Sequence, residues 1–220
     1  MKGIFNPDNP VVRFFIKIGY IWYLNILWLI TSIPLFTIGA STTALIYSCM
    51  KLQEDEGYPT KNFFHSFKEN FKQSTAIWGI YVGIGALLAM DLIYWNKQGV
   101  GFHNINLPWA VSIAICIVYG ISLSYVFAIQ SKFVNTVKNT IAYSILLPYR
   151  NLKQTILIAI VLGAVIYFNV TTIFMVNFIT MNIGVGLIAY LLGIFFKDVF
   201  KKYIPEEKTE DEIDMADANA

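Results

Sequence analysis

Two long stretches of the chain carry no charged residue, and each is too long for a single membrane crossing. The first runs from Ile18 to Met50 and the second from Gln154 to Phe196. As one helix the first stretch would reach about 50 Å, whereas the hydrocarbon core of a bilayer is about 30 Å thick. Each stretch therefore has to turn back. We expect the first reversal at Pro34 and Gly39, because proline lacks the donor a helix interior needs and glycine tolerates the backbone angles of a tight turn. The second reversal is expected within 177–184.

Shorter apolar segments complete the predicted fold, an all-α, polytopic membrane helix bundle. Six spans are expected at about residues 18–33, 40–50, 74–95, 108–130, 155–176 and 183–200. Two polar segments, 51–72 and 131–153, contain apolar stripes and predict two cytoplasmic surface helices. A five-span alternative places residues 40–50 in a re-entrant or surface helix. In either case residues 1–204 form the membrane domain and 205–220 a disordered acidic tail.

Composition and charge agree with this pattern. Only 14% of the 220 residues are charged, against about a quarter in soluble domains. If both termini and the two polar segments lie on one side, all but Lys97 of the 16 Lys and Arg residues are there, which makes that side cytoplasmic. Cys49 and Cys116 fall in predicted spans and are expected to be free thiols. No cleavable signal peptide is expected.

A short internal repeat joins the two polar segments to the spans that follow them. The residues Asn70-Phe71-Lys72-Gln73-Ser74 match Asn151-Leu152-Lys153-Gln154-Thr155, 81 positions later. Under the six-span topology both copies run in the same direction, which is typical of a parallel repeat about the membrane normal. Lys and Gln at a helix entry would also serve as simple interfacial anchors, so both interpretations stay open.

The first hairpin and the segment after it carry a family resemblance. An early Asn25 and Trp28 precede the run Pro34-Leu35-Phe36-Thr37-Ile38-Gly39-Ala40-Ser41-Thr42-Thr43-Ala44, and an aromatic-rich segment ends at Ser74. This pattern resembles the YesL-like family of small bacterial integral membrane proteins, whose function is unassigned. The resemblance implies a bacterial plasma-membrane protein that works beside oligosaccharide importers and glycan-degrading enzymes. It supplies no catalytic residue.

A group of small and polar side chains surrounds the first reversal. Its members are Asn25, Trp28, Pro34, Thr37, Gly39, Ser41 and Thr42. Hydroxyls and backbone groups freed at a broken helix could bind a polar ligand such as a sugar. Small residues also allow close helix packing, in which the hydroxyls bond to backbone carbonyls. The sequence favours packing but leaves both interpretations open.

Asp91 is the acid placed deepest in an apolar segment. Intramembrane carboxylates often serve proton coupling or pair with a cation, yet Asp91 also lies near the end of its span, where water and Lys97 can solvate it. His65 and His103 stand apart, with no acid or Cys at metal-ligand spacing, so no metal or other cofactor is expected.

The predicted function is that of an accessory or regulatory partner of a carbohydrate ABC importer, in contact with its permeases and with the lipid bilayer. The alternative is a small stand-alone solute transporter or channel. No arrangement of nucleophile and base predicts an enzyme, and no motif predicts nucleic-acid binding. Gly79 and Gly83 are spaced as in helix-dimer motifs and leave a homo-oligomer open.

Overall fold

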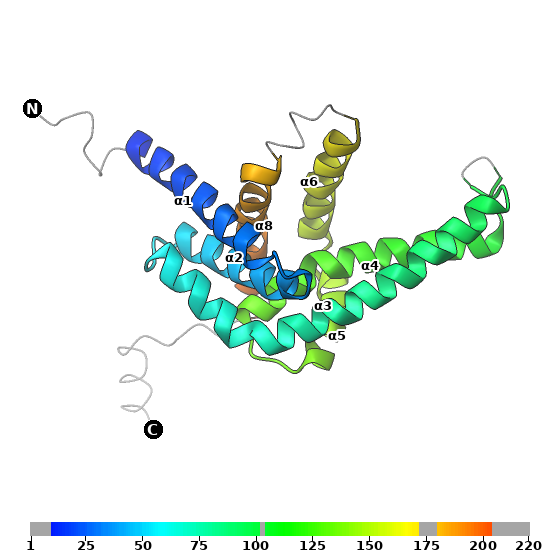
Figure 1. Cartoon of the computed structure of the whole chain (residues 1–220), viewed down its shortest axis with the longest axis horizontal. Helices are drawn as coiled ribbons and strands as arrows, with labels where there is room; N and C mark the ends of the chain where they lie inside the picture. Colours follow the sequence, from blue (N-terminus) through cyan, green and yellow to red (C-terminus); the bar gives the residue numbers. More distant parts are fainter. Residues whose placement is uncertain (1–9, 102–103, 172–179, 204–220) are drawn as a thin grey trace, which may run out of the picture.

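The computed structural model describes residues 10–101, 104–171 and 180–203. Its elements are α1 (Pro10–Thr31), the 3₁₀ turn η1 (Leu35–Thr37), α2 (Ile38–Gln53), α3 (Pro59–Lys97), α4 (Leu107–Lys132), α5 (Val137–Arg150), α6 (Leu152–Thr171), the π-helical turn η2 (Thr180–Gly184) and α8 (Val185–Phe200). Within the described ranges, six helices are long and apolar enough to cross a membrane. The predicted all-α membrane architecture is therefore confirmed (Figure 1).

The six long helices form three successive hairpins: α1 with α2, the second half of α3 with α4, and α6 with α8. In each hairpin the returning helix lies inside. The buried share of the apolar segment is 67% for α2 and 39% for α4 and α8, against 17% for α1 and 11% for α3 and α6. Ring contacts join α4 to α8, at 4.9 Å between Tyr125 and Phe196 and 5.1 Å between Phe133 and Phe200. The outer helices α1, α3 and α6 point in three different directions (Figure 1).

The first reversal lies at Pro34, as the sequence predicts, but the prediction that Gly39 belongs to the turn is wrong. Gly39 lies within α2, where its missing side chain allows close contact with α3. Helix α1 ends at Thr31, and Pro34 has an extended backbone conformation. The Thr37 hydroxyl donates to the carbonyl oxygens of Thr31 and Pro34, at 2.5 and 2.6 Å. It thereby satisfies carbonyls that the end of a helix leaves without an intrahelical donor.

Ion pairs show that both ends of this hairpin lie on the same side of the molecule. Lys17 near the start of α1 is 2.9 Å from Asp55, which follows α2. Lys197 near the end of α8 is 3.4 Å from Glu54. The chain therefore turns back between Lys17 and Asp55, which agrees with the even number of crossings in the six-span prediction.

The surface helix predicted within residues 51–72 is wrong as a separate element. Residues Pro59–Lys97 form one continuous helix, so the amphipathic segment and the span after it are a single α3. Its buried positions include Phe63, Ser66 and Ser74, and this face packs along α2. The segment has an apolar face and no interior proline, so nothing ends the helix once α2 covers that face. The residues before Ile18, from Pro10 on, likewise form the first part of α1.

The second predicted surface helix is a separate element. Helix α5 ends at Arg150, and Asn151 leaves the helical conformation with φ −128° and ψ 52° before α6 begins. Pro148 lies inside α5, which continues through it to Arg150, so the break comes three residues after the proline. The predicted acidic tail, His103 and part of the predicted turn at 177–184 lie outside the described residues.

The side-by-side ends of the first hairpin give a topology prediction. Ile33→Cys, at a position 75% exposed in the reversal, is expected to react with a membrane-impermeant maleimide added outside intact cells. Asp55→Cys is expected to react only after the membrane is opened. The wild-type protein serves as the control, because its native cysteines give the background level of maleimide labelling. Labelling of Lys17→Cys from outside would instead support the five-span alternative.

Candidate functional site

Gly39 is the point of closest approach between α2 and α3. A Cβ atom built at Gly39 would lie 2.5 Å from the Ser74 carbonyl oxygen and 2.7 Å from the Trp78 Cβ. One turn along α2, the Thr43 hydroxyl lies 2.9 Å from the Ser74 hydroxyl, within hydrogen-bond distance. The small residues of this segment therefore let two helix backbones touch, as they do in other membrane bundles.

Two indole groups fix the reversal to its neighbours. The Trp28 Nε1–H donates to the Thr42 hydroxyl at 3.1 Å, which joins α1 to α2. The Trp78 Nε1–H donates to the Leu35 carbonyl at 2.9 Å, which joins α3 to the 3₁₀ turn. Ser41 is fully buried in α2, and its hydroxyl has no hydrogen-bond partner among the described residues. Most polar groups predicted as a ligand patch are thus used in helix packing.

Asn25 joins α1 to the start of α8. Its Nδ2 donates to the Asn182 carbonyl at 2.7 Å, and its Oδ1 accepts the Gly186 N–H at 2.8 Å. The π-helical turn Thr180–Gly184 precedes this contact, and such turns interrupt the regular backbone ladder. The fully buried amide of Asn25 thus satisfies backbone groups of another helix, as the packing interpretation predicts.

Asp91 lies apart from these residues, on the arm that α3 and α4 form together. It accepts a hydrogen bond from the Trp95 indole, one turn along the same helix, at 3.2 Å. It is partly exposed, in line with a position near the end of the span. The structure therefore does not bring Asp91 together with Asn25 or with the residues around Gly39.

Two buried polar networks join α3, α4 and α5, and the sequence did not single them out. The Gln130 amide donates to Asn70 at 3.0 Å and to Gln73 at 2.8 Å, and its oxygen accepts from Thr140 at 3.2 Å. The sequence does hold a signal for this network, because amide side chains in apolar segments need hydrogen-bond partners. Their partners, however, lie far away in the sequence.

The second network is a triad of hydroxyls. Ser122 and Ser144 lie 2.7 Å apart, and Tyr81 contacts both of them. All three side chains are at least 95% buried. The triad fixes α5 to the arm, so this segment is anchored to the bundle rather than lying free on the membrane surface.

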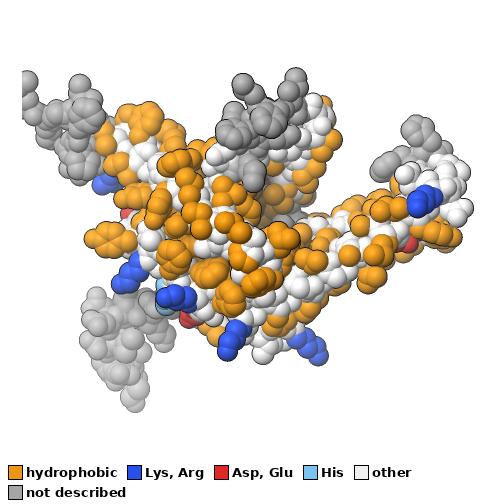
Figure 2. All heavy atoms as spheres, in the orientation of Figure 1, with side chains coloured by type: hydrophobic (Ala, Val, Ile, Leu, Met, Phe, Trp, Pro, Cys, Tyr) orange, Lys and Arg blue, Asp and Glu red, His pale blue; other side chains and the backbone are white. Residues whose placement is uncertain are grey.

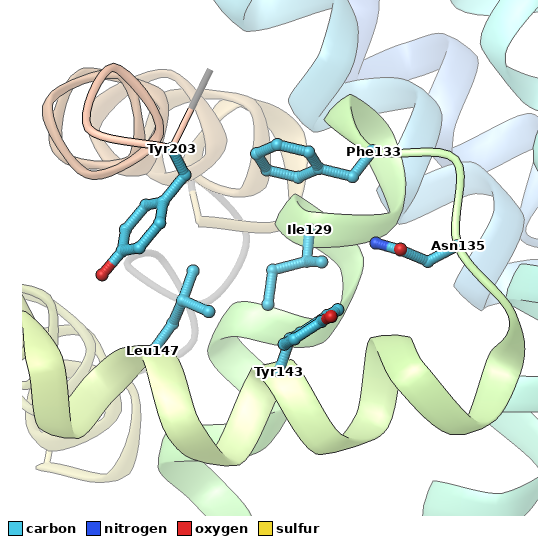
Figure 3. Close-up of a pocket in the computed structure, with 6 residues that line it drawn as sticks. All are labelled: Ile129, Phe133, Asn135, Tyr143, Leu147 and Tyr203. Atoms are coloured by element: carbon cyan, nitrogen blue, oxygen red, sulfur yellow. The ribbon is translucent and has the colours of Figure 1, made fainter. Parts of the chain in front are cut away.

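A hollow lies where α4 ends, beside α5 and the end of α8 (Figure 3). It has a volume of about 300 Å³, and its lining residues are Ile129, Phe133, Asn135, Tyr143, Leu147 and Tyr203. Figure 3 shows the Asn135 amide pointing between Phe133 and Tyr143. An apolar floor with a few neutral polar groups suits a small uncharged ligand or an inserted side chain.

A second hollow, of about 190 Å³, stands at the corresponding place after α2. Its lining residues include Ser48, Leu52 and Asn62, which lie 81 positions before Ile129, Phe133 and Tyr143. The sequence repeat therefore has a structural counterpart. It consists of a returning helix, a corner with a hollow, and an amphipathic segment.

The repeated Asn and Ser/Thr positions make matching hydrogen bonds. Asn70 and Asn151 each donate to the carbonyl four residues earlier, both at 3.1 Å. Ser74 bonds to a hydroxyl of α2, and Thr155 bonds to the Tyr125 hydroxyl of α4 at 2.8 Å. The interpretation of these residues as a true repeat is thus favoured over simple anchoring.

Charged residues surround the hollow that follows α2. The hydrogen bond from Lys17 holds the pKa of the Asp55 carboxyl below its usual value, and the hydrogen bond from Lys51 does the same for Glu56. Both carboxylates are solvent-exposed, so these ion pairs fix the corner without building a catalytic acid. Among the described residues no group of three His, Cys, Asp or Glu side chains could hold a metal ion.

Comparison with known proteins gives one match. Residues 21–92 match the family model described as "Protein of unknown function, DUF624", whereas no curated protein and no solved structure matches the chain. The matched segment contains much of α1, all of α2 and most of α3, including the Gly39 contact. Over residues 21–92 the chain is thus similar to the DUF624 family of unknown function, which is consistent with the resemblance to the YesL-like proteins.

Proposed function

We propose that the protein is an accessory or regulatory subunit of a carbohydrate ABC importer and acts by binding the importer's permeases within the bacterial plasma membrane. Its termini face the cytoplasm in this proposal, on the side that holds the cations around Lys17 and Lys197. The resemblance to the YesL-like proteins supplies the class of partner. The proposal includes no catalytic step.

One observation supports binding over transport. The buried polar side chains between the helices are largely bonded to one another or to backbone, as at Asn25, Gln130 and the Tyr81 triad. At the same time the outer helices keep large apolar side chains uncovered, such as Leu87 at 68% exposure and Ile160 at 62% (Figure 2). Polar groups that bind a transported solute need hydrogen-bond donors or acceptors that are not already paired within the protein, whereas helices that bind other helices need free apolar faces.

The alternative, a stand-alone transporter or channel, gains some support from the internal repeat and from the hollow at Tyr203. Repeats related about the membrane normal occur in several transporters. The hollow lies at the cation-rich end of α4 and α8, however, and its polar groups are few. We therefore rank transport second.

A deletion and a flux assay separate the two functions. Removal of the gene from its host is expected to lower uptake of the oligosaccharide that the importer carries, and re-expression of the wild-type protein restores it. Proteoliposomes that contain only this protein are expected to show no flux of that sugar above empty vesicles. Flux by the protein alone, or normal uptake in the deletion strain, would contradict the proposal.

A further inference from the structure

The repeat allows the same face of two returning helices to be compared. On α2 the face that contains Gly39 and Thr43 is covered by α3, which presses against Gly39. The corresponding residues 81 positions later on α4 are Gly120 and Ser124. A Cβ built at Gly120 would meet nothing within 4 Å, and Ser124 donates only to the Ile121 carbonyl of its own helix.

The third returning helix shows that the covered state is the usual one. On α8 a Cβ built at Gly186 would lie 2.7 Å from the Ile21 carbonyl oxygen and 3.1 Å from the Asn25 Cβ, so α1 presses on it. Two of the three returning helices thus use a glycine to seat another membrane helix. On α4 the corresponding face, with Ile117 at 57% exposure beside Gly120, is not covered by any of the residues that the structure describes.

The helix that the repeat would place on this face is α6, and the structure shows why it is elsewhere. The break at Asn151 lets α6 leave the direction of α5, whereas the matching junction in α3 is continuous. Thr155 still bonds to Tyr125 at the base of α6, but beyond this contact the two helices diverge (Figure 1). An apolar opening is left between α6 and the arm of α3 and α4 (Figure 2).

We propose that the open face of α4 around Ile117, Gly120 and Ser124 is a docking site for a transmembrane helix of a partner membrane protein. This inference rests on the proposed function, and it names the surface through which the partner binds. The occupant is a helix because helices fill both equivalent faces, at Gly39 and at Gly186. The glycine allows a close backbone approach, and Ser124 can then exchange its local hydrogen bond for one to the partner, as Thr43 does with Ser74.

Photocrosslinking in native membranes tests this site. A benzophenone amino acid replaces Ile117 in the full-length protein, and the same group at Leu87, 68% exposed on α3, serves as the lipid-facing control. The expected result is a discrete adduct at position 117 and none at position 87. Mass spectrometry is expected to place the partner's crosslinked peptide in a membrane-spanning segment of another multi-pass protein.

A matched pair of glycine variants makes the test specific. Gly120→Leu is expected to lower the yield of this adduct at least fivefold, because the leucine side chain would occupy the space that the partner helix needs for close contact with α4. Gly19→Leu on α1, where a Cβ also meets nothing within 4 Å, is expected to leave the yield unchanged. Both variants have room for their side chains, so both are expected to accumulate normally and to elute as the wild type does.

Three outcomes of the crosslinking would overturn the docking site. A crosslink within the chain from position 117 to α6 would mean that α6 itself closes on α4. An adduct between two copies of this chain would assign the face to self-association, and adducts with lipid only would make it an ordinary lipid contact. A crosslinked partner that is not an importer permease would support the docking site but contradict the proposed function. Importer permeases that bind the protein without forming an adduct at position 117 would support the proposed function but contradict the docking site.

Discussion

Gly39→Leu is expected to prevent the protein from accumulating in membranes in folded form. The new Cβ would lie 2.5 Å from the Ser74 carbonyl oxygen and 2.7 Å from the Trp78 Cβ. To remove this overlap, α3 would have to move away from α2, which is the most buried of the membrane-spanning helices. This movement would also strain the hydrogen bond between Thr43 and Ser74. Overpacking of this kind costs about 3 kcal/mol or more, a large part of the stability of a small domain. Membrane levels and detergent size-exclusion profiles measure the effect.

Gly79→Leu is the matched control for this variant. Gly79 lies on α3 one residue after Trp78, yet a Cβ there meets nothing within 4 Å. We expect this variant to accumulate as the wild type does, since both changes add the same side chain and remove the same helix-weakening glycine. Normal levels and normal protease resistance of Gly39→Leu would remove the contact between α2 and α3 from its central place in the fold.

Asn25→Leu is expected to destabilise the bundle by about 2 kcal/mol, because the N–H of Gly186 loses its buried acceptor and the carbonyl of Asn182 loses its donor. For a chain of this size the thermal midpoint in detergent should fall by about 6 °C. Limited proteolysis should also show earlier cleavage near the start of α8. Measurement by intrinsic fluorescence is suitable, since Trp22 and Trp28 flank the site.

Asn169→Leu provides the comparison for that variant. The Asn169 amide also lies in an apolar helix, but it donates to the Val165 carbonyl of α6 itself at 2.8 Å. Its loss separates no pair of helices, so the midpoint is expected to change by less than about 2 °C. Equal shifts for both variants would mean that Asn25 acts only within its own helix.

Patterns that depend on local physics were predictable from the sequence. The missing charges between Lys17 and Lys51, together with Pro34, correctly indicated a hairpin, because chain length and proline geometry leave few alternatives. The matching pentapeptides that begin at Asn70 and Asn151 indicated a repeat, and the equivalent side-chain hydrogen bonds of these two asparagines support it.

Features that depend on which helix covers which face were not predictable. A segment with the stripe of Phe63 and Phe67 looks the same whether lipid or α2 covers it, so α3 was divided into a surface helix and a span. The functional interpretation of the residues around Gly39 had the same difficulty. Hydroxyls such as Thr42 can bind a ligand or a neighbouring indole, and only the position of Trp28 decides between them.

The uncovered faces connect this architecture to the proposed function. Each returning helix offers one glycine-containing face, and the faces of α2 and α8 are used to hold the chain together. The face of α4 at Gly120 has the same construction and is uncovered in the described part of the chain. A protein built in this way has a ready surface for a membrane partner without any change in its own core.

Co-purification from native membranes tests the proposed function most directly. The tagged full-length protein is extracted in a mild detergent, and the proteins that follow it are identified and quantified by mass spectrometry. We expect permeases of a sugar importer in near-stoichiometric amounts from wild-type membranes, and a loss of most of that recovery with Gly120→Leu but not with Gly19→Leu. Recovery of the protein alone, or only as its own oligomer, would contradict the accessory function and favour an independent transporter.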